Sequence, residues 1–326
     1  METKSSKKRL FWIDWLKVIG IYFIVLGHFS SYFSDFIYIF NVPLFFIISG
    51  FLSKHEDKSI FWKKLFFNLI VPMLIICAIN YGISNIFAIF QNTATDPFLT
   101  YAKWAIIGDW QKLGTCWFIY TLVIIKIINW LARTTNLMII ISILFLTGAY
   151  MIRHYLSEVS FLTRPNSIID VCTAFPFFTI GILCKQINNY LSELKSKSTL
   201  ITLFVVGLLL MVVCERFNSS NYMYMCVYGN NILLFLIGGF AGTSTIFSLS
   251  KMLHSKPNSI VTLSKGTILI LGFHPWFILW IRTHQPTPSL FDFLFALLIV
   301  LFFIPIILFS EKYFPIILGK YRITKS

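Results

Sequence analysis

The chain has 326 residues, of which 57% are hydrophobic and only 12% are charged, and its mean hydropathy is +0.78. Soluble domains carry about 25% charged residues, so this composition excludes a water-soluble fold. The formal charge of +14 does not indicate nucleic acid binding, because Lys and Arg are spread over short segments between apolar runs instead of forming one patch.

Apolar segments long enough to cross a bilayer, which takes about 17 to 25 residues, recur along the whole chain. We predict ten spans: 10–28, 36–53, 65–87, 116–132, 137–152, 168–184, 199–214, 231–250, 260–281 and 291–309. No polar stretch between them is long enough for a separate soluble domain. We therefore expect one all-α transmembrane bundle over residues 1–326, without a metal site, since the six cysteines include no CxxC pair.

The distribution of basic residues orients these spans. Of the 27 Lys and Arg residues, 19 fall on one side of the predicted membrane, 6 fall on the other, and Lys17 and Lys126 lie within spans. The positive-inside rule then places both termini in the cytoplasm.

The first span carries Asp14, Lys17 and His28. A charge at the centre of a span costs about 2.5 to 3.5 kcal/mol on insertion scales, so each needs a partner or a task. At 100° per residue the three side chains share an arc of about 60°, and Lys17 and His28 are about 16 Å apart along the axis. This stripe predicts a lined cavity or tunnel. Alternatively, Asp14 and Lys17 form an ion pair near the interface and His28 ends the helix among headgroups.

Polar residues in the next two spans are further candidates. In NVPLFFIISGF, Asn41 lies close in depth to His28 and is a candidate substrate contact, whereas packing explains Ser49 as well as function does. Lys63 and Lys64 precede a helix that contains Asn68. Their ammonium groups are suited to phosphates, but also to anionic lipid.

The ninth span places His274 before Pro275 in LILGFHPWFILW. Either His274 contacts a substrate, or it is a structural residue bonded to a backbone carbonyl that Pro275 frees.

Five motifs in chain order resemble the acyltransferase 3 family of membrane proteins, and within it the fucose 4-O-acetylase-like polysaccharide O-acetyltransferases. The motifs are RLFWIDWLKVIGIYFIVLGH, FNVPLFFIISGFL, KKLFFNLIVPML, CWFIYTL and LSKGTILILGFHPWF, and they extend over nearly the whole chain.

The resemblance implies a bacterial plasma or inner membrane enzyme that transfers an acyl group, usually acetyl, from cytoplasmic acyl-CoA to a hydroxyl. The acceptor would be a cell-surface glycan or its lipid-linked precursor, and membrane lipids would be the other partner. His28 matches the family's essential histidine, Lys17 its basic residue and Asp14 the acidic position nearby. Asn41 stands where relatives commonly have histidine, and Asn68 stands where many carry an arginine associated with acyl-CoA binding.

We therefore expect His28 to act as general base, because a neutral imidazole is suited to take a hydroxyl proton at physiological pH. Whether the acyl group passes through an acyl-histidine stays open. The expected sites are catalytic His28, Lys17 and Asp14; substrate-binding Asn41, Ser49, Trp117 and His274; and acetyl-CoA-binding Lys63, Lys64 and Asn68. Two alternatives remain, namely a proton-coupled carrier or flippase of a lipid-linked sugar and a non-catalytic membrane partner or sensor.

Overall fold

The computed structural model describes residues 9–29, 32–155, 167–194, 196–218, 221–225 and 227–320. Almost all of its regular structure is helical, and one antiparallel pair of strands is formed by β1 (Asn221–Tyr222) and β2 (Val227–Tyr228). The helices of the first half are α1 (Phe11–His28), α2 (Ser34–Tyr38), α3 (Asn41–Phe51), α4 (Lys58–Leu65), α5 (Val71–Phe90), α6 (Phe98–Ile107), α7 (Trp110–Leu113) and α8 (Trp117–Ala132). Those of the second half are α9 (Thr135–Tyr155), α11 (Ser167–Gln186), α12 (Asn188–Glu193), α13 (Lys197–Phe217), α14 (Ile232–Met252), α15 (Asn258–Lys265), α16 (Thr267–His284) and α17 (Phe291–Tyr313).

Short segments of other helix types join these elements. A π-helical turn, η1 (Phe66–Ile70), continues α4 into α5. The 3₁₀ turns are η2 (Gly114–Cys116), η3 (Met223–Met225) and η4 (Pro315–Leu318).

Nine segments within the described residues are long and apolar enough to cross a membrane, and the bent pair α15–α16 makes a tenth if it is counted as one span. This result confirms the predicted all-α membrane bundle of about ten spans. Large apolar side chains stay exposed along the outer helices, as expected for surfaces in contact with lipid. On α13, for example, Leu209 is 60% exposed.

The predicted span 260–281 was wrong in being continuous, because α15 and α16 meet at an angle of 82°. Gly266 occupies the corner with non-helical dihedrals. A Cβ atom at this position would lie 2.2 Å from the side chain of Ile307 on α17, so the corner needs a residue without a side chain. The predicted span 36–53 corresponds to one candidate span, Ser34–Phe51, which contains both α2 and α3.

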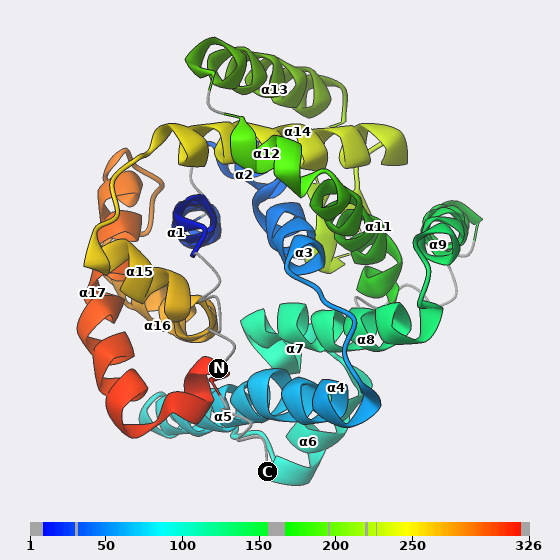
Figure 1. The fold of residues 1–326 in the computed structure, drawn as a ribbon. Helices are drawn as coiled ribbons and strands as arrows, with labels where there is room; N and C mark the ends of the chain where they lie inside the picture. Colours follow the sequence, from blue (N-terminus) through cyan, green and yellow to red (C-terminus); the bar gives the residue numbers. More distant parts are fainter. Residues whose placement is uncertain are drawn as a thin grey trace, which may run out of the picture.

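Helix α1 occupies a central position in the bundle. Figure 1 shows it nearly end-on, with α3, α14 and α15–α16 around it. Val25 and Leu26 are fully buried among these neighbours. A polar residue on α1 therefore faces other helices, where it meets protein or an internal cavity.

Helices α3 and α11 approach each other closely through two glycines. A Cβ atom on Gly50 would lie 1.9 Å from the carbonyl oxygen of Phe178, and one on Gly181 would lie 2.0 Å from that of Ile47. Small residues allow membrane helices to bring their backbones into contact. This glycine seam, formed by Gly50 and Gly181, holds α3 against α11.

Candidate functional site

The polar residues of α1 line two cavities that meet. Asp14 and Lys17 line the lower cavity, of about 370 Å³, toward the start of α1, and His28 lines the histidine cavity, of about 30 Å³, at its end. Ile24, Phe118 and Leu271 line both cavities. The residues that the sequence places on one face of the first span thus line two adjoining cavities, and we call this row of cavities the path.

Asp14 is held by groups from outside its own helix. Arg9 donates to both carboxylate oxygens, through Nε at 2.6 Å and Nη2 at 2.7 Å, and Ser264 Oγ donates at 2.6 Å. The hydrogen bond to Asp14 raises the pKa of Arg9 above its ordinary value. The alternative of an Asp14–Lys17 ion pair is therefore wrong, and Lys17 makes no ion pair within the described parts of the chain.

His28 lies against a second histidine, His274, which is fully buried and is not among the residues that line the histidine cavity. The ring centroids of His28 and His274 are 4.9 Å apart. His274 Nδ1 lies 2.8 Å from the carbonyl oxygen of Ile270, so Nδ1 carries the hydrogen that this oxygen accepts. The other nitrogen, Nε2, is buried and has no hydrogen-bond partner among the described residues.

The carbonyl that Pro275 frees is that of Leu271, four residues earlier. It accepts a hydrogen bond of 2.6 Å from Thr115 Oγ1, a residue that also lines the histidine cavity. The backbone bond expected for His274 goes instead to Ile270, one residue before the freed carbonyl. Sequence reasoning missed Thr115, since nothing local to residue 115 indicates a proline on another helix.

Three other predicted substrate contacts fall in two places. Asn41 and Trp117 line the histidine cavity together with His28. Ser49 lines the lower cavity beside Lys17, so it belongs to the opposite part of the path. The Asn41 side chain accepts a hydrogen bond of 2.8 Å from the backbone of Val42, which fixes its amide.

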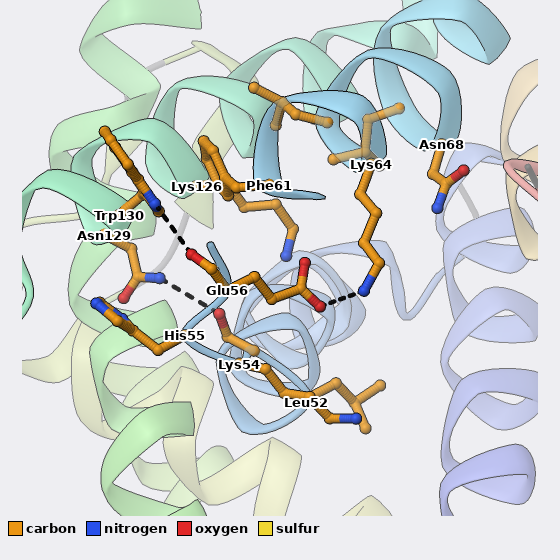
Figure 2. Close-up of a pocket in the computed structure, with 13 residues that line it drawn as sticks. Leu52, Lys54, His55, Glu56, Phe61, Lys64, Asn68, Lys126, Asn129 and Trp130 are labelled. Carbon is orange, nitrogen blue, oxygen red and sulfur yellow. Dashed lines mark hydrogen bonds and ion pairs between the residues drawn. The ribbon is translucent and has the colours of Figure 1, made fainter. Parts of the chain in front are cut away.

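A third cavity, which we call the basic cavity, continues the path in the opposite direction from His28. It measures about 340 Å³ and shares Leu52, Asn68 and Leu69 with the lower cavity. Figure 2 shows that Lys64 of α4 and Lys126 of α8 extend their ammonium groups toward Glu56, with which Lys64 forms an ion pair. Asn68 therefore lies where the two cavities join.

An aromatic pair closes one side of the basic cavity. Phe61 and Trp130 stack at 5.3 Å with an interplanar angle of 15°, and Trp130 Nε1 donates to the backbone oxygen of Glu56 at 3.4 Å (Figure 2). Asn129 donates to Ser53 Oγ at 3.3 Å. These contacts position the α3–α4 connection that carries Glu56.

The two neighbouring lysines at the start of the third span differ in environment. Lys64 lines the basic cavity, whereas Lys63 is exposed and is not among the described residues that line the basic, lower or histidine cavity. Lys126 was not among the predicted site residues, although a lysine inside a span is itself a signal of a functional cavity.

Arg282, also missed from the sequence, fixes the end of α1 beside His28. Its guanidinium donates to the carbonyl oxygen of Phe29 and, at 2.9 Å, to Asp292 Oδ2. Further bonds reach the carbonyl oxygens of Gln285 and Thr287 at 3.2 and 3.1 Å. One side chain thereby joins the ends of α1, α16 and α17.

A family model described as an acyltransferase domain matches residues 10–310. The match includes His28, the three adjoining cavities and nearly all of their lining residues. A search of curated proteins and a search of solved structures each returned no match. The chain belongs to the acyltransferase 3 family and is a multi-pass membrane acyltransferase.

Proposed function

We propose that this protein is an O-acetyltransferase of the bacterial cell membrane. It transfers an acetyl group from cytoplasmic acetyl-CoA to a hydroxyl of a surface polysaccharide or a lipid-linked glycan precursor. The observation that carries the proposal is the row of three adjoining cavities, the basic, the lower and the histidine cavity, which share lining residues and end at His28. Such a path lets a donor from one side of the membrane present its thioester to a base near the other.

The charge along this path suits an anionic nucleotide. The basic cavity contains three lysines against one carboxylate, that of Glu56. Three of the cations that line the path, Lys17, Lys54 and Lys126, make no ion pair within the described residues. Phosphate groups would complement such ammonium groups. Lys126 would supply the charge that Asn68 lacks.

The stretch between Lys17 and His28 is mostly apolar. Ile21, Ile24, Phe118 and Leu122 are among its lining residues. An uncharged arm that carries a thioester at its tip fits this stretch better than a phosphate does, because an unpaired charge is costly away from water. The donor would therefore lie with its nucleotide in the basic cavity and its acetyl group at His28.

His28 acts as general base in this mechanism. The acceptor oxygen attacks the thioester carbonyl carbon while His28 takes the hydroxyl proton, the C–S bond breaks, and the thiolate receives that proton from the imidazolium. The products are the acetyl ester and free CoA. Positioned base catalysis of this kind contributes about 10² to 10⁴ in rate.

The deciding experiment uses purified protein in lipid nanodiscs with radiolabelled acetyl-CoA and oligosaccharides released from the surface glycan of the producing cells. We expect label to enter the glycan and free CoA thiol to appear in equal amount. Movement of the oligosaccharide across sealed vesicles without consumption of acetyl-CoA would instead establish a carrier and reject the proposal.

A further inference from the structure

A fourth cavity, of about 390 Å³, lies between α5, the α6–α7 region and α16, and we call it the outer cavity. Its contacts on α5 begin at Asn80, which is 16 residues beyond Lys64 of the basic cavity, or about 24 Å along the helical axis. The outer cavity is therefore near the end of the bundle opposite to the basic cavity. None of the residues predicted from the sequence lines it.

The outer cavity and the histidine cavity adjoin at Thr115. Thr115 lines both the outer and the histidine cavity, and its hydroxyl bonds to the carbonyl oxygen of Leu271 at 2.6 Å. On α16, Gly272 and Trp276 are four residues apart and line the outer cavity from one face. His274, about 200° around the helix from Gly272, contacts His28.

The lining of the outer cavity is polar but balanced in charge. Lys112 forms an ion pair with Asp96, and no other charged residue is among the described residues that line the cavity. Amides and hydroxyls accompany the aromatic rings of Tyr81, Tyr101 and Trp276. In contrast to the basic cavity, this site favours a neutral polyhydroxyl ligand, since amide and carboxylate groups bond hydroxyls and ring faces cover C–H surfaces.

The aromatic wall of the outer cavity is held in place by hydrogen bonds. Trp276 Nε1 donates to Asn80 Oδ1 at 2.9 Å, and Asn80 Nδ2 donates to the carbonyl oxygen of Gly272 at 3.1 Å. Phe87 stacks on Trp276 at 5.6 Å with an interplanar angle of 10°. A ring fixed before the ligand arrives loses little freedom on binding.

We propose that the outer cavity binds a sugar residue of the acceptor, with Trp276 and Tyr81 against its ring and Asn85, Gln111 and Asp96 toward its hydroxyls. The hydroxyl to be acylated then passes Thr115 to reach His28. This inference rests on the proposed function, because it assigns the acceptor of that same reaction.

The first test measures saccharide binding without acyl transfer. Saturation-transfer NMR on the full chain in nanodiscs uses oligosaccharides released from the producing cells, with methyl glycosides of common hexoses as defined probes. We expect binding to weaken at least tenfold in Trp276→Ala. Trp280→Ala, on the same helix at a residue 67% exposed and outside the described cavities, is expected to bind like the unchanged chain. Equal binding by both variants, or no binding by the unchanged chain, overturns the proposal.

A second pair of variants fills the cavity without removing a contact. Ser84→Phe adds a ring at an exposed position that lines the outer cavity, whereas Ala78→Phe adds one on α5 at an exposed position outside the described cavities. We expect only Ser84→Phe to lose saccharide binding, with CoA affinity unchanged in both. Saccharide binding retained by Ser84→Phe would contradict the site, while failure of the unchanged chain to acetylate glycan would reject only the proposed reaction.

Discussion

The imidazole rings of His28 and His274 lie 4.9 Å apart, centroid to centroid, where the end of α1 meets the middle of α16. His274 is anchored through Nδ1 to the carbonyl oxygen of Ile270, while the His28 ring forms no hydrogen bond with another described residue. Tyr38 also contacts the His28 ring, at 6.4 Å and nearly at a right angle. The base proposed for the reaction is therefore oriented by ring contacts, and His274 provides the nearer of these two rings.

Replacing His28 with Ala is expected to lower the rate of glycan acetylation by about 10² to 10⁴, because the hydroxyl then loses its proton without a positioned base. Radiolabel transfer to the glycan measures the rate after membrane expression has been matched. His284→Ala, at the exposed end of α16, is the control and should keep full activity. Unchanged transfer in His28→Ala would remove His28 from the mechanism.

Replacing His274 with Asn keeps an amide hydrogen for the carbonyl of Ile270 but removes the atom at the Nε2 position. We expect kcat to fall at least tenfold while the unfolding temperature and the KM for acetyl-CoA change little, since His274 lies beside His28 and outside the donor path. Steady-state kinetics with thermal unfolding separates these effects. A protein that unfolds early but has normal kcat would assign His274 a structural role only.

Replacing Lys126 with Met is expected to weaken CoA binding about tenfold, which corresponds to about 1.4 kcal/mol, because the nucleotide phosphates lose one ammonium group. Isothermal calorimetry with CoA measures the affinity. Lys63→Met removes the same charge from an exposed position beside the cavity and should bind normally. Repeating the titration in nanodiscs without anionic lipid shows whether headgroups compete for this position, and equal affinities in both variants would argue against the basic cavity.

Replacing Asp14 with Asn is expected to destabilise the protein by about 1 to 3 kcal/mol, since charge-assisted hydrogen bonds to the buried carboxylate are lost. Thermal unfolding in one detergent provides the comparison, and Ser264→Ala, which removes one bond, should cost less. Because the pKa of Arg9 is raised, its contribution is complete below its unfolded value and disappears only as pH rises through the higher folded value. Titration of Arg9 should therefore leave the stability difference between Asp14→Asn and the unchanged chain constant between about pH 6 and 9. A stability difference that changes within this range would indicate that another group titrates.

Replacing Arg282 with Lys is expected to lower kcat about tenfold, because a single ammonium cannot join Phe29, Asp292 and the α16–α17 connection at once. The affinity for CoA should stay unchanged, since Arg282 lies at the end of α16 remote from the basic cavity. Kinetics and CoA titration on the same preparation test both statements. A loss of CoA affinity without a loss of kcat would contradict this positioning role.

The sequence was sufficient to predict the polar face of α1, because the positions of Asp14, Lys17 and His28 around one helix follow from helical periodicity alone. The sequence was not sufficient to predict which residues hydrogen-bond to these side chains. Arg9 contacts Asp14 from the segment that precedes α1, and Ser264 contacts it from α15. Only the tertiary packing of the bundle brings Ser264 beside α1. The family match supports the acyltransferase class, and the predicted residue roles await the experiments above.

Two other differences between the sequence-based predictions and the structure have identifiable physical causes. Hydropathy cannot distinguish Lys63 from Lys64, since the exposure of each depends on where α4 packs. Hydropathy also treats 260–281 as one span, because a bend at Gly266 changes the direction of the chain without changing its apolar content. The space that Ile307 occupies at this corner is a property of the folded bundle.

The glycine seam between α3 and α11 gives the histidine cavity one rigid wall. Two backbones in contact cannot slide past each other without a clash, so Asn41, at the start of α3, keeps a fixed position. The histidine cavity, with room for about two water molecules, must widen to admit an acetyl group and a sugar hydroxyl. We expect that widening at a part of the lining outside α3. The hydrogen bond from Thr115 to Leu271 of α16, two residues that both line the cavity, is a contact that can open there.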